Sequence, residues 1–365
     1  MTRKLRLGFV GANVHSHWAS QSHFPALAAS PDVELTAVCT TRPESAEEAR
    51  KAFGAKLAFH DFRAMVASPQ IDAVAVCVRV PLHYDPTAAA IEAGKHVYTE
   101  WPLGRNTAEA EKLAALAKAK GVHTVVGLQS RVSPALAYTK ELIEEGYVGE
   151  VLACHVVCMR DGPLERPSSR AWQRDASLGA NPLTIANGHV IDALRYVVGD
   201  FARVACMVTT QVRQWYETDT KRQVDVTSPD NVLVAGKLAR GAVASVHVAG
   251  VPWAGIGYRM DIYGREGALV VTGNVSSQRG ESLRLQGARR SQTLNDLTIP
   301  ERFTWVPPEF PRGDPFNVGQ MYARFAEAVA TGANRLPTFD TAVELHRFID
   351  IIKQSSDTGR ELPVA

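Results

Sequence analysis

Short apolar runs alternate with helical stretches over the first third of the chain. Strands are predicted at residues 5–11, 33–39, 73–78, 96–100 and 123–128, and helices at 17–30, 43–53, 84–94 and 106–121. The strand segments are almost wholly apolar, which is typical of strands that are buried on both faces. The alternation therefore predicts an α/β domain, a doubly wound parallel sheet with helices on both sides.

After about residue 128 the pattern changes to longer runs in which apolar and polar positions alternate. These runs lie at residues 150–162, 201–213, 231–250 and 258–273, with hairpin turns expected at "ARG" and "GREG". They predict a second, α+β domain with a large, mostly antiparallel sheet, closed by helices near residues 317–331 and 339–354. We expect the domains to span residues 1–128 and 129–365.

The second sheet has two faces to cover and few helices to cover them, so a homodimer or homotetramer is expected. The 365 residues carry a net charge of +2 without a block of like charges, so no nucleic-acid partner is predicted. The first apolar run is too short for a signal peptide, and no run is long enough to span a bilayer. We therefore expect a cytoplasmic protein with no membrane contact.

The five cysteines stand singly within apolar runs rather than in a C-x-x-C pattern. They are interpreted as small buried hydrophobic residues, not as disulfides or metal ligands. No zinc motif, nucleophile elbow, Walker loop or paired-carboxylate signature occurs, and no metal site is predicted.

The turn after the first strand, "GFVGANVHSHW", lies where a dinucleotide-binding fold holds a pyrophosphate at a helix N-terminus. Gly11 is present, whereas Asn13 and Ser16 stand at the second and third glycine positions of the G-x-G-x-x-G pattern. Asparagine tolerates a left-handed backbone and serine is small, so the turn remains feasible. All three residues are candidates for cofactor binding.

The second strand ends in Thr40, Thr41 and Arg42, without the acidic residue that holds the ribose of NAD. A guanidinium there suits a 2′-phosphate, which favours NADP over NAD. The alternative is that Arg42 is a solvated loop residue.

Three further segments carry a specific resemblance: "VPLHYDPTAAAIEAGKHVYTEWPLG", "GLQSRVSPALAYTKELIEEGYVGEV" and "NGHVIDALRYVVGD". In order and spacing they resemble the glucose-fructose oxidoreductase/inositol dehydrogenase (Gfo/Idh/MocA) family. The resemblance implies a Rossmann domain that binds NAD(P)(H) and an open-faced sheet domain that supplies the substrate pocket. It also implies hydride exchange at a carbinol carbon of a sugar or polyol.

The family's E-K-P loop corresponds to Glu100, Trp101 and Pro102, so the usual lysine is replaced by tryptophan. Pro102 is expected to keep the turn through a cis bond or a fixed φ, and Glu100 to orient the neighbouring loop beside the cofactor. The Trp101 indole either stacks on the nicotinamide or a sugar face, or packs the loop.

The third segment places His189 at the family's histidine and Asp192 at the later acid, but Ile185 stands where the family usually has aspartate. The resemblance implies that His189 carries the acid-base step. Asp192 is expected near the substrate.

Three more residues are candidates for the site. His83, at a helix start, is expected beside the nicotinamide ribose or else is a helix-start residue without such a role. Gln129 and Arg131 follow the last Rossmann strand on the crevice side, where open α/β sheets bind ligands. Arg131 either orients a substrate group or pairs with an acid between the domains.

The leading hypothesis is an NAD(P)-dependent oxidoreductase acting on a sugar, a cyclitol or a related carbonyl compound. The "EWPLG" loop and the first turn ending in "SHFPAL" also resemble the branch of the family that contains the yeast galactose-pathway co-repressor. A non-catalytic, dinucleotide-binding regulator is therefore the main alternative. A non-redox, NAD-dependent enzyme that cleaves glycosides is the third.

Overall fold

The computed structural model describes residues 3–15, 18–161, 164–251, 253–274 and 283–364. The chain forms two compact units: unit 1 comprises Met1–Gln129 and Thr304–Glu344, and unit 2 comprises Ser130–Phe303 and Leu345–Ala365. The expected single boundary after residue 128 is therefore wrong for the end of the chain. Helix α9 (Asp314–Thr331) returns to unit 1 because it packs against α1, η1 and β2.

Unit 1 is built on a six-stranded sheet in the order β3-β2-β1-β4-β5-β6, and all of its strands are parallel. The strands are β1 (Leu5–Val10), β2 (Val33–Cys39), β3 (Leu57–Phe59), β4 (Ala73–Val76), β5 (His96–Glu100) and β6 (Thr124–Gly127). The predicted parallel sheet is confirmed. Strand order reverses direction between β1 and β4, which is the point where open α/β sheets bind ligands.

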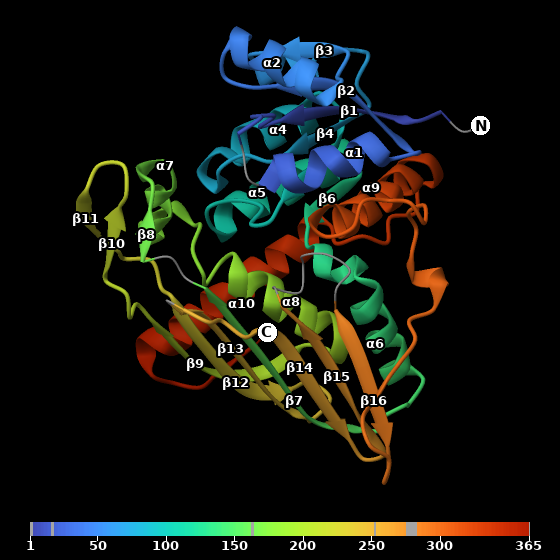
Figure 1. Cartoon of the computed structure of the whole chain (residues 1–365), viewed down its shortest axis with the longest axis vertical. Helices are drawn as coiled ribbons and strands as arrows, with labels where there is room; N and C mark the ends of the chain where they lie inside the picture. The colour runs from blue at the N-terminus through green and yellow to red at the C-terminus, as the bar shows by residue number, and fades with distance from the viewer. Residues whose placement is uncertain (1–2, 16–17, 162–163, 252, 275–282, 365) are drawn as a thin grey trace. The chain divides into compact units, whose positions relative to one another are not determined.

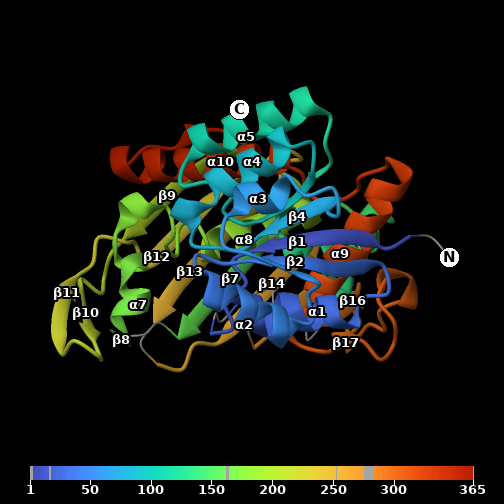
Figure 2. The ribbon, with the colours of Figure 1, turned by 90° about the horizontal axis from the view of Figure 1, so that it is seen from above.

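Helices cover both faces of this sheet. Figure 2 shows α3, α4 and α5 on one side of β1 and β4, and α1 and α2 on the other. The helices of unit 1 are η1 (Ala19–His23), α1 (Phe24–Ala29), α2 (Pro43–Phe53), α3 (Phe62–Val66), η2 (Val80–Leu82), α4 (Tyr84–Glu92), α5 (Thr107–Lys120) and α9. The helix predicted at 17–30 includes a π-helical segment, η1, and β3 and α3 are too short to be detected by periodicity.

Unit 2 contains a nine-stranded sheet in the order β17-β16-β15-β14-β7-β13-β12-β9-β18 (Figure 1). Its strands are β7 (Val151–Asp161), β9 (Phe201–Thr209), β12 (Asn231–Leu238), β13 (Val243–Val251), β14 (Gly257–Gly264), β15 (Gly267–Gly273), β16 (Arg284–Arg289), β17 (Asn295–Asp296) and β18 (Leu362–Pro363). Strands β7 and β13 pair in parallel and the other described pairs of this sheet are antiparallel. The mostly antiparallel sheet and both hairpins are confirmed.

One face of this sheet packs against helices, and no helix among the described residues packs against the other. The covering helices are α6 (Pro134–Glu144), α8 (Ala186–Val198) and the part of α10 (Phe339–Thr358) that belongs to unit 2 (Figure 1). Along β13, Val246 and Val248 are buried beneath them. On the other face Met207, Leu233 and Val243 are 60%, 39% and 64% exposed.

A separate three-stranded sheet, called here the small sheet, has the order β11-β10-β8. It consists of β8 (Glu165–Arg166), β10 (Gln214–Glu217) and β11 (Arg222–Asp225), and three short helices follow β8: α7 (Ser168–Ala171), η4 (Trp172–Arg174) and η5 (Ala176–Leu178). Two further 3-10 turns are η3 (Gln129–Val132) and η6 (Glu301–Phe303). The sequence pattern did not predict the small sheet, because its strands are only two to four residues long.

Candidate functional site

Gly11 closes the turn at the carboxyl end of β1. Its φ is +97°, and a Cβ atom on it would lie 2.1 Å from the carbonyl oxygen of Cys77. No side chain is accommodated at that distance, so glycine is required for β1 and β4 to approach at the point where strand order reverses. The Gly11 amide bonds the Cys39 carbonyl at 3.0 Å, which ties the turn to β2.

Asn13 lies exposed in the same turn, and its Oδ1 accepts a hydrogen bond of 2.8 Å from the His15 amide. This side-chain turn, rather than a left-handed backbone, lets asparagine replace the second glycine. Ser16, at the third glycine position, lies outside the described residues. Cofactor binding by Asn13 and Ser16 stays a prediction.

Three candidates for cofactor binding follow β2, and two of them are exposed to solvent. Thr40 Oγ1 lies 2.7 Å from Ser45 Oγ and donates to the Arg42 carbonyl at 3.1 Å, so it fixes the start of α2. Thr41 and Arg42 are exposed, and Arg42 makes no ion pair with any residue that the structure describes. An exposed guanidinium without an acidic partner suits an anionic ligand.

Glu100, at the carboxyl end of β5, is the centre of a buried hydrogen-bond network in unit 1. Its Oε1 accepts from Tyr98 Oη at 2.9 Å, Gln129 Nε2 at 2.8 Å and His23 Nε2 at 3.1 Å. Its Oε2 accepts from the Trp18 indole at 3.2 Å. Four donors compensate the loss of water around a carboxylate that is only 7% exposed.

Gly127 leaves the room that this carboxylate occupies, since a Cβ there would lie 2.6 Å from Glu100 Oε1. His23 extends the network, because its Nδ1 lies 2.8 Å from the hydroxyl of Tyr322 on α9. Glu100 and Gln129, both predicted from the sequence, are thus brought together. His23 and Tyr322 were missed; the one available signal was a histidine directly before the apolar helix α1.

Trp101 and Pro102 are joined by a cis peptide bond, as expected for this turn, and the Trp101 side chain is only 4% exposed. His83 fixes the loop from the other side: its Nδ1 lies 2.7 Å from the Pro102 carbonyl and its Nε2 3.0 Å from the Val78 carbonyl. Burial lowers the pKa of His83. Both ring nitrogens are engaged by the backbone, and the predicted contact of His83 with a nicotinamide ribose stays a prediction.

In unit 2, Arg131 and Asp192 are bonded to each other. Arg131 Nη2 lies 2.7 Å and Nε 3.1 Å from Asp192 Oδ1, and the guanidinium lies 5.5 Å from the ring centroid of Tyr196. Arg131 therefore pairs with an acid, but within unit 2 and not between the domains as expected; its contact with a substrate group stays a prediction. Asp192 is fully buried, so it holds the guanidinium in one orientation.

His189 lies in the first turn of α8 and is 5% exposed. Two residues earlier, Asn187 is fully buried, and neither its Nδ2 nor its Oδ1 has a hydrogen-bond partner among the described residues. A buried amide that bonds nothing is costly, so a water or a ligand is expected to satisfy it. Periodicity along α8 could not identify Asn187, because it marks only which positions are buried.

The five thiols are free; Cys39, Cys154 and Cys158 are buried as predicted, whereas Cys77 and Cys206 are only partly buried. Burial raises the pKa of the Cys154 thiol to about 12, so this thiol stays protonated.

Within the described part of the chain, no three histidine, cysteine or acidic side chains form a group that could hold a metal ion. No described helix combines the length and apolarity needed to cross a membrane.

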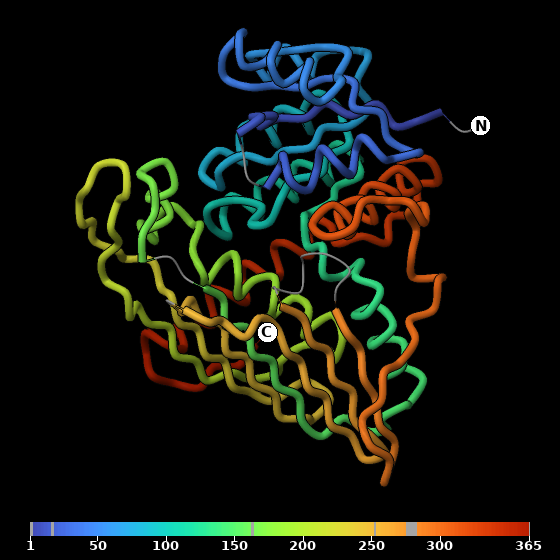
Figure 3. Tube along the Cα trace, viewed as in Figure 1, coloured from blue at the N-terminus to red at the C-terminus, as the bar shows by residue number. Residues whose placement is uncertain are grey.

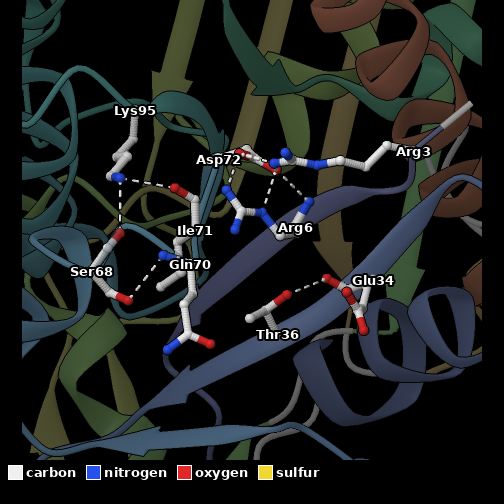
Figure 4. Close-up of polar contacts among 9 residues, drawn as sticks. All are labelled: Arg3, Arg6, Glu34, Thr36, Ser68, Gln70, Ile71, Asp72 and Lys95. Carbon is white, nitrogen blue, oxygen red and sulfur yellow. Dashed lines mark hydrogen bonds and ion pairs between the residues drawn. The ribbon is translucent and has the colours of Figure 1, made fainter.

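A broad hollow of about 980 Å³ opens at the amino-terminal edge of the unit 1 sheet, and none of the predicted site residues line it. Figure 4 shows how its polar groups are used: Asp72 accepts from Arg3 Nη2 at 2.7 Å and from Arg6 Nη2 at 2.7 Å. Lys95 Nζ donates to the Ser68 and Ile71 carbonyls at 2.9 and 2.8 Å. These cations are engaged by the protein itself, so the hollow is not the candidate site.

Comparison with known proteins agrees with this architecture. Residues 5–128 match the family described as "Oxidoreductase family, NAD-binding Rossmann fold" (Gfo/Idh/MocA), and residues 134–273 match the family described as "Gal80p, C-terminal domain". The first third of the chain thus matches the Gfo/Idh/MocA model, and the following segment matches the Gal80p model. The resemblance inferred from the sequence, including that to the co-repressor branch, is therefore confirmed.

The proteins to which this chain is similar include both enzymes and regulators. Dehydrogenase aclE of Aspergillus oryzae is 29% identical over 99% of this chain and 98% of its own length. The galactose/lactose metabolism regulatory protein GAL80 of Saccharomyces cerevisiae is 29% identical over 66% of this chain and 59% of its own length. The structure of levoglucosan dehydrogenase in complex with NADH and levoglucosan superposes with a TM-score of 0.87, at 25% identity, covering 99% of this chain and 100% of that one.

Proposed function

We propose that the protein is an NAD(P)-dependent oxidoreductase that transfers a hydride to or from a sugar, a cyclitol or a related carbinol or carbonyl compound. The observation that carries the proposal is the Gly11 turn, which lies where the strand order of a parallel sheet reverses and where only glycine fits. The dehydrogenases among the relatives support the same reaction class.

The nucleotide would be held by the turn after β1 and by the end of β2. The exposed Thr41 and Arg42 suit a 2′-phosphate, which favours NADP over NAD in this proposal. A bound nicotinamide supplies the hydride acceptor or donor. The chain's own groups must then bind and orient the carbinol and move its proton.

His189 is the proposed acid-base group, because the family's lysine position holds Trp101 and its aspartate position holds Ile185. Trp101 would pack against the apolar face of a sugar or against the nicotinamide. Arg131, held by Asp192, would donate to a substrate oxygen, and in this proposal Asp192 acts on the substrate through Arg131. Asn187 would offer a donor and an acceptor to a hydroxyl.

The proposal includes a homodimer or homotetramer, supported by the exposed Met207, Leu233 and Val243 on the sheet face that no described helix covers. A cytoplasmic location and the lack of nucleic-acid and membrane partners stay predictions.

The test is to purify the protein, release and identify any bound nucleotide, and follow the absorbance of reduced nicotinamide against a library of sugars, polyols and their carbonyl derivatives. Turnover of at least one neutral sugar or cyclitol with NAD or NADP supports the proposal. Nucleotide binding without turnover of any compound would replace it with the regulator.

A dinucleotide-binding regulator is the second candidate, because the lysine and aspartate positions are occupied by side chains that exchange no proton, Trp101 and Ile185. The match of residues 134–273 to the Gal80p domain favours it as well. A non-redox, NAD-dependent glycoside-cleaving enzyme is a third possibility; it would release sugar from a glycoside without net change in nicotinamide absorbance.

A further inference from the structure

The small sheet of unit 2 carries a cluster of arginines that the proposed reaction does not use. Figures 1 and 3 show β8, α7 and the β10–β11 hairpin side by side, outside the nine-stranded sheet. Arg166 ends β8, Arg170 lies in α7 and Arg160 lies near the end of β7. The cluster is defined here as these three residues.

Arg166 is held in one position by two neighbours. Its guanidinium carbon lies 4.0 Å from the ring centroid of Trp215, which is 7% exposed, and its Nη1 donates to Gln173 Oε1 at 2.7 Å. The stack fixes the plane of the guanidinium, and the hydrogen bond fixes its rotation within that plane.

The remaining edge of this guanidinium is unused. Its Nε is buried and has no hydrogen-bond partner among the described residues, and its Nη2 makes no hydrogen bond with any of them. Nε and Nη2 point in parallel, which is the geometry that binds two oxygens of a carboxylate or a phosphate.

The neighbouring charges that act on Arg166 are positive. Burial, followed by the charges of Arg170 and Arg160, lowers the pKa of Arg166 to about 10. Within the described residues, Arg166 and Arg170 form no ion pair with an acidic side chain. The nearest strand partner, Glu217, accepts instead from Thr220 Oγ1 at 2.6 Å and lies 3.7 Å from Arg222. A half-buried cation without a counter-ion is costly unless a ligand supplies the opposite charge.

We propose that Arg166, together with Arg160 and Arg170, binds the oxyanion of a small acidic ligand, a carboxylate or a phosphate group. Arg166 would donate through Nε and Nη2, while Arg160 and Arg170 would add charge around the same group. The site needs no nucleotide, so it is tested independently of the proposed oxidoreductase reaction.

The competing explanation is purely structural. In it, the Arg166 guanidinium only stacks on Trp215, and its Nε and Nη2 are solvated by water. The two explanations differ for Arg170, which is exposed and whose guanidinium bonds no described residue. Removing the Arg170 charge leaves a structural stack unchanged but weakens a bound anion.

The experiment measures binding to the full chain without nucleotide, by calorimetry and by thermal shift. The probes are inorganic phosphate, D-glucuronate and neutral D-glucose, each at the same ionic strength set with chloride. The variants are Arg166→Gln and Arg170→Gln, and the matched control is Arg213→Gln, which removes an exposed arginine just before β10.

We expect the wild type and Arg213→Gln to bind at least one anionic probe while glucose, in the absence of nucleotide, gives no comparable signal. Since a charge-assisted contact is worth roughly ten- to a hundredfold in affinity, Arg166→Gln should lose that much and Arg170→Gln a smaller factor. Preference for phosphate would assign a phosphate ligand, and preference for glucuronate a carboxylate ligand; both support the site.

Three results would overturn the proposal: no anion binding by the wild type above the chloride control, full affinity in Arg166→Gln, or equal loss in all three variants. If Arg166→Gln fails to fold, Arg170→Gln decides, because its exposed side chain is not needed for folding. Unchanged affinity in Arg170→Gln together with a misfolded Arg166→Gln establishes the structural explanation.

Discussion

Arg131 and Asp192 hold each other in unit 2: the guanidinium Nε and Nη2 lie 3.0 and 2.7 Å from the carboxylate oxygens. The sequence places both residues at the substrate, but the Asp192 side chain has no exposed surface while that of Arg131 is 24% exposed. The accessible member of the pair is therefore Arg131. Asp192 positions it and neutralises its charge.

Asp192→Asn should lower the free energy of unfolding by about 3 kcal/mol. Loss of one partner of a buried pair costs about 3–5 kcal/mol, and the partial exposure of Arg131 places this pair at the lower end. Urea unfolding measures the change. Arg265→Gln is the control, because its pair with Glu150 is 65% and 59% exposed and should contribute less than about 1 kcal/mol. Equal losses in the two variants would show that the Asp192 pair behaves as a surface pair.

The parallel strands of unit 1 could be predicted because a strand buried on both faces leaves an apolar run, which is uninterrupted in β4 (AVAV). The role of Gly11 could be predicted because a tight turn between a strand and a helix favours a residue without a side chain. The network around Glu100 could not be predicted, since His23 lies 77 positions from Glu100 along the chain, Tyr322 lies 299 positions from His23, and no local pattern joins the three. The same limit applies to Asn187, whose unsatisfied amide shows only once its neighbours are placed.

Arg42→Ala should weaken binding of NADP by roughly ten- to a hundredfold and leave NAD nearly unchanged. The reason is that an exposed guanidinium without a described acidic partner can bond a 2′-phosphate, and such charge-assisted contacts are worth about 1.5–3 kcal/mol. Fluorescence titration with both reduced nucleotides measures the ratio. Equal effects on NADP and NAD binding would show that Arg42 is a solvated loop residue.

Asp72 should make stability depend on pH at the acidic end. Burial acts to raise the pKa of Asp72, but hydrogen bonds from Arg6 and Arg3 outweigh it and hold the pKa well below the usual range. A carboxyl with a depressed folded-state pKa stabilises the protein above its unfolded pKa of about 3.9, and this contribution is lost as the pH falls below that value towards the folded-state pKa.

Asp72→Asn should therefore flatten the dependence of unfolding free energy on pH below about pH 4, as measured by urea titrations across the acidic range. Arg6→Gln should remove most of the same slope while it leaves the carboxyl in place. A slope unchanged in both variants would show that other groups control acid stability.

The open face of the nine-stranded sheet should form the contact between subunits. Met207 pairs in register with Leu233, and the two are 60% and 39% exposed. Two buried carboxylates facing a partner are costly, so the double variant Met207→Asp/Leu233→Asp should sediment as a monomer at micromolar concentration, whereas the wild type sediments as a dimer or tetramer. The control Leu294→Asp changes a side chain that is 42% exposed but lies outside the sheet strands, and it should keep the wild-type state. A monomeric wild type would contradict the prediction.

Tyr98 should not carry the proton of the reaction. Burial, followed by the charge of Glu100, raises the pKa of Tyr98 well above its usual value, so the phenol stays protonated over any practical assay range. Tyr98→Phe should leave the pH profile of turnover unchanged and cost about 1 kcal/mol of stability through the lost hydrogen bond to Glu100. A pH limb that disappears in Tyr98→Phe would instead place this residue on the proton route.

His189 is then the group on which turnover should depend. General acid-base help is worth about two to four orders of magnitude, so His189→Ala should lower kcat by that factor and leave nucleotide affinity nearly unchanged. Trp101→Ala provides the contrast: loss of a stacking surface should raise KM while the pH profile stays in place.

If His189→Ala keeps full turnover, the proton travels through water, since Tyr98 is excluded by its burial. If His189→Ala and Trp101→Ala change KM alone and by similar factors, both residues only shape the pocket. A loss of kcat confined to His189→Ala, together with loss of the pH limb, would show that this protein performs hydride chemistry with a histidine and with tryptophan in place of the lysine.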